Sequence, residues 1–206
     1  MSNPASTAGY AEAADTLVRT YESIRFEDVH DGILHLIPEP HRDGRPGSAL
    51  DIGAGTGRDA AALARRGFAV TAAEPTAELR DHGQRLHAGL DIRWLDDALP
   101  DLPRLTATGE TFNLVMLTAV WMHLDAAERT RAMAAVAPLV AKGGRLALSL
   151  RHGPVPEGRR MFDVPADEVV ATAAHYGLAL LHRSHRSDMF DRGDVHWDLL
   201  VLERPA

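Results

Sequence analysis

The segment DIGAGTGR holds residue types that are suited to binding a small ligand. Gly53, Gly55 and Gly57 stand at alternate positions behind the strand-like stretch that ends near Asp51, and the helical pattern DAAALARRG follows at once. A strand, a glycine turn and a helix start together bring the backbone close to a nucleotide-like ligand. The segment therefore predicts a cofactor site.

The spacing of these glycines argues against a dinucleotide. A dinucleotide-binding loop carries glycines at its first, third and sixth positions, and the sixth position counted from Gly53 is Arg58. The carboxylate of Asp51 would face a pyrophosphate unfavourably, whereas it suits a ligand with positive charge. The loop thus favours a cation-bearing cofactor, and a dinucleotide oxidoreductase is disfavoured.

Residues behind two later strand-like stretches could act on a substrate. His123 follows the first in VWMHL, and the neighbours Arg151 and His152 follow the second in SLRHGP. Histidine suits general-base catalysis near neutral pH, and arginine can bind a carboxylate or phosphate through a bidentate contact. We expect these three residues to act in catalysis or to contact the substrate. For His123 the alternative is a structural contact that anchors the next helix near Asp125.

Two further patterns bear on the site. Trp121 could stack on a planar ring, or it could cover the cofactor as an apolar residue. His182, His185 and Asp188 are residue types that bind metals. Side chains three residues apart on a strand point to opposite faces and cannot bind one ion, so we expect no metal site.

Strand and helix patterns alternate from residue 48 onward. The predicted helices cover about 57–66, 76–87, 125–144 and 166–177; the third opens with DAAE, in which Asp125 and Glu128 can form a capping box. Such alternation predicts βαβ units and a mostly parallel sheet covered on both faces. The predicted strands are SALDIG (48–53), FAVTAAE (68–74), DIRWL (91–95), TFNLVML (111–117), RLALSL (145–150), LALLHRS (178–184) and VHWDLLVLE (195–203).

The last two predicted strands are joined by a short segment, RSDMFDRGD. A parallel pair needs about a dozen or more connecting residues, so this segment predicts an antiparallel last strand. The fold class that follows is α/β: a Rossmann-like, doubly wound, mostly parallel seven-stranded sheet with an antiparallel last strand.

An N-terminal segment precedes the alternation. Two helices are predicted between Tyr10 and Ile37, and the turn-rich linker PEPHRDGRPG follows them. We therefore divide the chain into an N-terminal helical cap, residues 1–40, and one α/β domain, residues 46–206. The cap is expected to close over the pocket, with Tyr21 and Phe26 as apolar contacts to the substrate.

These features resemble the class I S-adenosylmethionine-dependent methyltransferases. In that family an acid precedes alternating glycines, as in LDIGAGTGR, and the second strand ends in an acid that binds both ribose hydroxyls, here Glu74. Another acid near the adenine amino group corresponds to Asp96 or Asp97. The resemblance implies S-adenosyl-L-methionine as cofactor and S-adenosyl-L-homocysteine as product. The implied cofactor-binding residues are Asp51, Gly53, Ala54, Gly55, Gly57, Glu74, Pro75, Asp96, Asp97, Ala98 and Thr118.

The resemblance covers about residues 48–203. It is closest to small stand-alone bacterial members with GRDAA after the loop and WMHL after the fourth strand, and these share no single substrate. It implies methylation of an oxygen or nitrogen of a small molecule. A methyltransferase acting on a protein or RNA and a non-catalytic cofactor-binding module are the alternatives.

The amino-acid composition limits the classes of partner and site that we expect. Lys and Arg number 22 against 29 Asp and Glu, a net charge of −7 without a basic run, so we do not expect duplex nucleic acid as a partner. The chain has no cysteine, which excludes disulfides, thiolate metal sites and cysteine nucleophiles. With neither a signal-peptide pattern nor a long apolar stretch, we expect a cytoplasmic protein without membrane contact.

Overall fold

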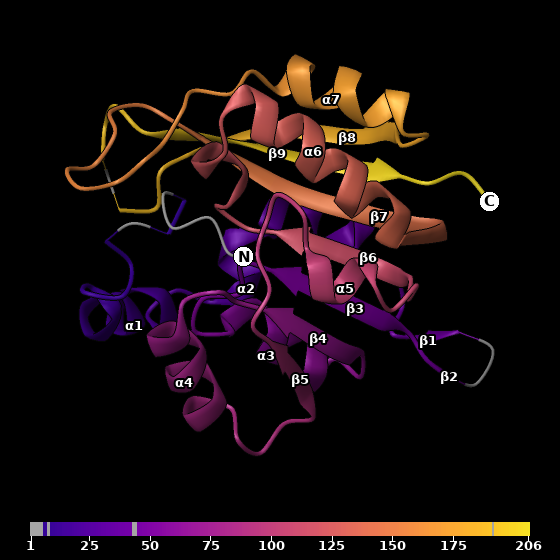
Figure 1. The fold of residues 1–206 in the computed structure, drawn as a ribbon, viewed down its shortest axis with the longest axis horizontal. Coiled ribbons are helices and arrows are strands. Elements are labelled where there is room, and N and C mark those ends of the chain that lie inside the picture. Colours follow the sequence, from indigo (N-terminus) through magenta and orange to yellow (C-terminus); the bar gives the residue numbers. More distant parts are fainter. Residues whose placement is uncertain (1–5, 8, 43–44, 191) are drawn as a thin grey trace.

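A seven-stranded sheet forms the centre of the molecule (Figure 1). The structure is a computed structural model and describes residues 6–7, 9–42, 45–190 and 192–206. The strand order is β5-β4-β3-β6-β7-β9-β8, and all pairs are parallel except those of β9 with β7 and β8. The strands are β3 (Ser48–Ile52), β4 (Ala69–Ala73), β5 (Ile92–Leu95), β6 (Phe112–Leu117), β7 (Val140–His152), β8 (Ala179–Ser187) and β9 (His196–Glu203).

Helices cover both faces of this sheet. They are α1 (Ala14–Glu22), α2 (Phe26–Val29), α3 (Arg58–Arg65), α4 (Ala77–Leu86), α5 (Pro103–Thr106), α6 (Ala126–Val136) and α7 (Ala166–His175). In Figure 1, α5, α6 and α7 lie in front of the sheet, and α2 and α3 lie behind it. The prediction of a doubly wound α/β fold with an antiparallel last strand is therefore confirmed. Among the described residues, no helix is both long and apolar enough to cross a membrane.

The apolar core is divided into layers by the sheet. Leu50 belongs to the cluster that contains Met133 of α6, whereas the preceding residue, Ala49, belongs to the cluster that contains Leu63 of α3. Successive side chains of a strand point to opposite faces, so a strand covered on both sides must be apolar throughout. This explains why the parallel strands were recognisable as continuous apolar runs.

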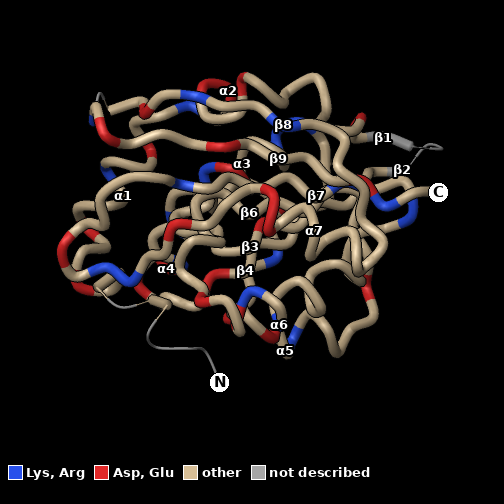
Figure 2. The backbone as a smooth tube through the Cα atoms, turned by 90° about the horizontal axis from the view of Figure 1, so that it is seen from above, with Lys and Arg blue, Asp and Glu red and all other residues tan. Residues whose placement is uncertain are grey.

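Charged residues of both signs are interspersed along the backbone (Figure 2). Exposed pairs such as Arg183 with Asp167, 2.9 Å apart, and Arg93 with Glu110 place opposite charges side by side. Exposed pairs of this kind contribute little to stability, because water and salt screen them.

One predicted helix ends earlier than expected. α6 begins at the predicted capping box, in which Asp125 and Glu128 exchange side-chain and backbone hydrogen bonds. It ends at Val136, not at the predicted glycine pair, because the 3-10 turn η3 (Ala137–Leu139) and then β7 follow. Pro138 in this turn has no N–H with which to continue the helical ladder. The glycine pair lies inside β7, beside a register shift opposite β6.

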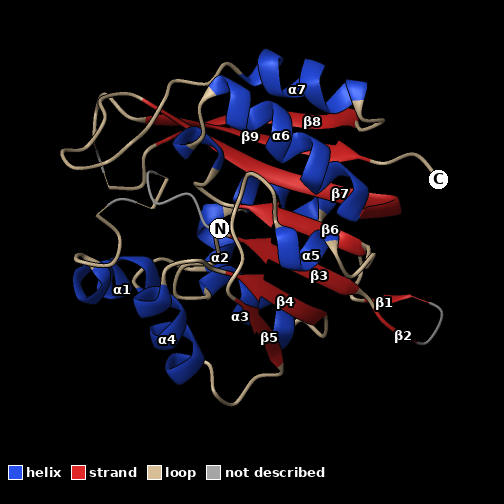
Figure 3. Ribbon diagram, in the orientation of Figure 1, coloured by secondary structure: helices blue, strands red, loops and turns tan. Residues whose placement is uncertain are grey.

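The N-terminal segment has two different environments (Figure 3). α1 contacts α4 beside the carboxyl ends of the parallel strands. The second predicted helix is divided into α2 and the 3-10 helix η1 (Asp31–Leu36), and Ile33 of η1 joins the core behind the sheet. The predicted linker contains a short antiparallel pair, β1 (His41–Arg42) and β2 (Arg45–Pro46). Only the first half of the segment therefore lies over the strand ends.

Candidate functional site

A cavity of about 450 Å³ lies at the carboxyl ends of the parallel strands. Its wall is formed by the loops after β3, β4, β5 and β6, by α1, and by the ends of β7, β8 and β9. Open α/β sheets bind ligands at this edge, next to the point where the strand order reverses, which here is between β3 and β6. The volume is in the range of small-molecule sites, roughly 300–1,000 Å³.

The glycine loop brings backbone to the cavity wall. Gly53, Gly55 and Gly57 have φ values of +70°, +57° and +84°, which glycine adopts without a steric penalty. A Cβ atom at Gly53 would lie 2.5 Å from Val120, and one at Gly57 would lie 2.6 Å from Trp94. Gly53 and Gly55 line the cavity, whereas Gly57 lies against Trp94 and starts α3.

Glu74 connects the end of β4 to this loop. Its carboxylate accepts the N–H of Gly55 at 2.7 Å on Oε2 and the N–H of Thr76 at 2.8 Å on Oε1. Burial raises the pKa of Glu74. Because each carboxylate oxygen has a further lone pair and the residue lines the cavity, Glu74 can still accept two ligand hydroxyl groups.

The two acids after β5 occupy different environments. Asp97 is buried, lines the cavity with Ala98, and accepts the N–H of Leu105 at 2.8 Å. Asp96 is exposed, and its carboxylate lies 3.6 Å from Arg80 instead. Of the two predicted candidates, only Asp97 is placed to contact a ligand in the cavity.

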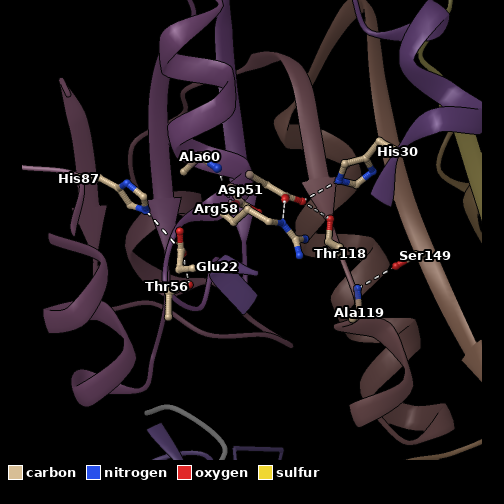
Figure 4. Close-up of polar contacts among 11 residues, drawn as sticks. Glu22, His30, Asp51, Thr56, Arg58, Ala60, His87, Thr118, Ala119 and Ser149 are labelled. Atoms are coloured by element: carbon tan, nitrogen blue, oxygen red, sulfur yellow. Dashed lines mark hydrogen bonds and ion pairs between the residues drawn. The ribbon is translucent and has the colours of Figure 1, made fainter. Parts of the chain in front are cut away.

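A buried charge network lies beneath the loop (Figure 4). Asp59 accepts hydrogen bonds from Nε2 of His30 at 2.8 Å, Nε of Arg58 at 2.7 Å and Oγ1 of Thr118 at 2.6 Å. Burial opposes the charge of this carboxylate, but the charges of His30 and Arg58 outweigh burial and lower the pKa of Asp59. Asp59 therefore stays ionised, and its ion pair with Arg58 neutralises the charge of that side chain.

Asp51 lies next to this network in a less favourable position. Its Oδ2 accepts the N–H of Ala60 at 3.1 Å, as Figure 4 shows. Burial and the neighbouring charge of Asp59 raise the pKa of Asp51 well above its ordinary value. A cation in the cavity would offset both effects, which agrees with the expectation of a positively charged ligand.

α1 covers the cavity and is tied to the loop. Glu22 at its end accepts the hydroxyl hydrogen of Thr56 at 2.7 Å and lies 3.7 Å from Nε2 of His87 (Figure 4). Tyr21 lines the cavity, and a Cβ atom at Gly55 would lie 3.5 Å from its ring. The predicted contact of Tyr21 with the pocket is therefore present.

His123 is held between a tyrosine and a backbone carbonyl. Its Nδ1 lies 2.8 Å from the carbonyl oxygen of Arg160, which can only accept, so Nδ1 carries the proton. Nε2 then accepts the hydroxyl hydrogen of Tyr10 at 2.9 Å. Burial lowers the pKa of His123 and favours the neutral ring. The alternative considered for His123, a structural contact that anchors the next helix near Asp125, is also present: Arg160 donates to the carbonyl oxygen of His123 at 3.1 Å and pairs with Asp125 at 2.9 Å.

The predicted pair Arg151 and His152 is divided between the two faces of the sheet. Both residues belong to β7, where successive side chains alternate. Arg151 lines the cavity. His152 instead lies 2.6 Å from Asp163 and stacks on His196 with ring centroids 4.8 Å apart. The expectation that both would line the pocket therefore holds only for Arg151.

Phe26 and Trp121 do not line the cavity either. Phe26 is buried behind the sheet, and its ring centroid lies 4.6 Å from that of His30. Trp121 is buried in the cluster that contains Met133. Both side chains belong to the apolar core, so the structure does not support the expected substrate contacts. Aromatic residues fill cores and pockets alike, and their positions in the sequence do not distinguish these two uses.

The other predicted cofactor residues Ala54, Pro75 and Thr118 also line the cavity. In the part of the chain that the structure describes, no group of three His, Asp or Glu side chains could hold a metal ion. The cavity residues that had not been predicted include Tyr10, Arg58, Asp59, Arg159, Arg186, Asp188, Arg192 and Trp197. Several of them follow from strand register, because Arg186 and Trp197 lie level with Arg151.

Comparison with known proteins identifies the domain. A sequence model of the methyltransferase domain family matches residues 49–144. No curated protein matches the chain significantly. Among solved structures, the chain is similar to a TehB-like SAM-dependent methyltransferase from Corynebacterium glutamicum, with 19% identity and a TM-score of 0.67 over 98% of this chain and 100% of that chain.

Two further solved structures show the same fold. The N-methyltransferase NodS from Bradyrhizobium japonicum, in complex with S-adenosyl-L-homocysteine, has 19% identity and a TM-score of 0.66 over 87% of each chain. The 1,6-didemethyltoxoflavin-N1-methyltransferase of Burkholderia thailandensis has 19% identity and a TM-score of 0.60 over 95% of this chain and 90% of that chain. Residues 49–144 therefore match the methyltransferase domain family, and the chain shares the fold of these solved methyltransferases.

Proposed function

We propose that this chain transfers a methyl group from S-adenosyl-L-methionine to an oxygen or nitrogen atom of a small molecule. The observation that carries the proposal is the cavity at the strand ends, whose wall contains the glycine loop, Glu74 and Asp97 together with His123. The proposal includes a cytoplasmic location and a partner that is neither duplex nucleic acid nor a membrane.

The residues in the cavity fit this cofactor chemically. Glu74 has free lone pairs for two ribose hydroxyls, and Asp97 is a buried acceptor for an amino group of adenine. A positive charge beside Asp51 would offset the burial and the charge of Asp59 that raise its pKa, and the charged groups of the cofactor would supply it. The remaining contacts would come from the backbone at Gly53 and Gly55.

Residues of the chain can accept the proton that the acceptor loses when it is methylated. When bound, S-adenosyl-L-methionine supplies an activated methyl group on a positively charged sulfur. A hydroxyl or amine acceptor loses a proton as it is methylated, and a positioned base assists this loss. The Tyr10 hydroxyl donates to Nε2 of His123, so it can take the proton of an acceptor while it passes its own proton to His123.

A small acceptor is supported by the cover over the cavity. α1 and Tyr10 form part of the cavity wall, so an acceptor has to fit between them and the ends of the strands. Two of the solved structures that share the fold are N-methyltransferases, one of which contains bound 1,6-didemethyltoxoflavin. The interspersed surface charges and the net charge of −7 also favour a small acceptor over duplex nucleic acid.

The first test is binding of S-adenosyl-L-homocysteine by isothermal titration to the wild type and to the Glu74→Ala variant. We expect one-to-one binding that weakens by about 1.5–3 kcal/mol in the variant, because charge-assisted hydrogen bonds are lost. Glu78→Ala, an exposed acid on α4, is the matched control and should bind normally. No binding to the wild type would refute the proposed function.

Transfer of labelled methyl groups in a cell extract then identifies the acceptor class. Label in the small-molecule fraction supports the proposal. Label confined to protein or RNA would indicate a macromolecular acceptor. Binding without any transfer would indicate a cofactor-binding module that has lost catalysis.

A further inference from the structure

Two arginines flank a tryptophan in the part of the cavity wall that β7, β8 and β9 form. Arg151 of β7 lies directly opposite Trp197 of β9, and Arg186 of β8 lies opposite the same tryptophan on its other side. Residues that are directly opposite in neighbouring strands point to the same face of the sheet. All three side chains accordingly line the cavity, and the guanidinium carbon of Arg186 lies 5.3 Å from the Trp197 ring centroid.

Neither arginine is neutralised by the protein. Across the described residues, no carboxylate lies within ion-pair distance of Arg151 or Arg186. Arg151 donates only a long hydrogen bond, 3.4 Å, to the carbonyl of Gly153, and Nε of Arg186 is buried without a hydrogen-bond partner. Buried cations are costly unless a partner compensates them, so an anion would stabilise Arg151, which is buried, and to a lesser extent Arg186, which is partly buried.

The nearby acid Asp188 does not fill this role. Its carboxylate accepts two hydrogen bonds from Arg192, at 2.7 and 2.8 Å, and one from Nε1 of Trp197 at 3.0 Å. The bond with Arg192 is the main reason why the pKa of Asp188 is lowered. The charge of Asp188 also raises the pKa of Arg151 and of Arg186, but its carboxylate is paired with Arg192 and lies outside ion-pair distance of both.

Burial and like charge support this view of the site. Burial first, and then the neighbouring charge of Arg192, lower the pKa of Arg151. Burial likewise lowers the pKa of Arg186. Each shift means that the protonated guanidinium is disfavoured where it stands, and an anion between the two side chains would reverse the effect.

The wall beside the arginines is apolar. Met122, Trp197 and Val195 form a small cluster with Met161 against it, and Met122, Met161 and Trp197 line the cavity. A ligand at this place would therefore meet charge on one side and apolar surface on the other.

We propose that Arg151 and Arg186 bind an oxyanion, a carboxylate or a phosphate, on a small acceptor whose apolar body lies against Trp197 and the two methionines. The inference rests on the proposed methyltransferase function, because it places the acceptor beside β7, β8 and β9 in the cavity that the cofactor residues also line. Guanidinium groups bind both kinds of oxyanion in bidentate geometry. The specificity of the enzyme is then set by the charge of the acceptor.

The test uses three probes that differ in charge. Benzoate carries a carboxylate and phenyl phosphate carries a phosphate. Benzamide has nearly the same shape as benzoate but no charge. Each is titrated at millimolar concentration into the isotope-labelled protein, with and without saturating S-adenosyl-L-homocysteine, and followed by NMR. We expect at least one of the two anions to bind about tenfold or more tightly than benzamide, because it adds charge-assisted hydrogen bonds. The stronger of the two identifies the class of oxyanion.

Variants locate the binding to the two arginines. Arg151→Gln and Arg186→Gln should each weaken anion binding about tenfold and leave benzamide unaffected. Arg186 is only partly buried, so its variant tests the proposal even if Arg151→Gln folds poorly. Arg183→Gln is the matched control. Arg183 lies on β8, as Arg186 does, but it pairs with Asp167 and Asp198, so its substitution should not alter anion binding.

The results separate this inference from the proposed function. If neither anion binds the wild type, if benzamide binds equally well, or if Arg183→Gln weakens binding as much as the other variants, the oxyanion site is refuted. Intact binding of S-adenosyl-L-homocysteine in that case leaves the methyltransferase proposal standing. Anion binding by a chain that does not bind S-adenosyl-L-homocysteine would refute the proposed function instead.

Discussion

Asp51 shows how one side chain couples ligand binding to stability. Burial and the charge of Asp59 raise its pKa in the folded chain, so folding favours the protonated carboxyl. The contribution of such a group to stability is greatest below its unfolded pKa and is lost as pH rises towards the folded pKa. At neutral pH the ligand-free chain is therefore less stable than it would be with a neutral side chain at this position.

Asp51→Asn is expected to raise the melting temperature of the ligand-free chain at neutral pH. The gain should be about 2–4 °C for each kcal/mol of relieved charge, because the amide oxygen can still accept the N–H of Ala60. The same change should weaken binding of S-adenosyl-L-methionine, which loses a partner for its positive charge. Calorimetry with and without ligand measures both effects, with the exposed Asp81→Asn as control. A ligand-free variant that melts below the wild type would contradict this account.

The residues of the site differ in how far the sequence could predict them. Asp51 and Glu74 were predicted because an acid at a strand end beside a glycine loop has few structural uses. The choice between Asp96 and Asp97 depends on which side chain the turn after β5 buries, and the pattern does not contain that information. Neighbouring side chains on a strand point to opposite faces, so the sequence alone could have shown that Arg151 and His152 do not line the same pocket.

The strands were the most predictable elements. Their apolar runs are bounded by glycine, proline and charged residues, and the ends of β3, β4, β5 and β6 differ little from the predicted ones. β7 begins at Val140, earlier than the predicted Arg145. Helix ends were less predictable where two stop signals follow each other. In α6 the earlier signal, Pro138, ends the helix. The glycine pair lies in β7 instead, where the register between β6 and β7 shifts. The pairing of η1 with the back of the sheet is a tertiary contact that local patterns do not encode.

α1 is the element whose dynamics should respond most to the cofactor. It contributes Leu17, Thr20 and Tyr21 to the cavity wall, and it contacts α4 beside the strand ends. Because a bound ligand would lie between α1 and the glycine loop, we expect S-adenosyl-L-homocysteine to slow amide hydrogen exchange in Ala14–Glu22.

Exchange mass spectrometry with and without ligand checks this expectation. α7 (Ala166–His175), which contributes no residue to the cavity wall among those described, is the internal control and should not change. Slowing at residues 53–58 with unchanged exchange in α1 would mean that the helix does not cover the bound cofactor.

At the scale of the whole molecule, the cavity joins parts that are distant in the chain. The methyltransferase domain match ends at residue 144, yet the proposed oxyanion site is built from β7, β8 and β9 beyond it. Both parts share one continuous sheet, and the N-terminal segment contacts each of them through α1 and η1. We call β3 to β6, with the cofactor residues, the cofactor side, and β7 to β9, with the proposed oxyanion site, the acceptor side. Because one sheet joins them, we expect neither side to unfold without the other.

S-adenosyl-L-homocysteine should therefore stabilise the chain as one unit. A ligand at about 100 times its dissociation constant adds about 2.7 kcal/mol, which for a chain of this size corresponds to about 5–10 °C in melting temperature. We expect a single transition that shifts as a whole by calorimetry and by near-ultraviolet circular dichroism, because the tryptophans lie on both sides of the sheet's switch point. The Glu74→Ala variant should shift much less at the same concentration of ligand. Two transitions, of which only one responds to the ligand, would show that the acceptor side folds independently of the cofactor side.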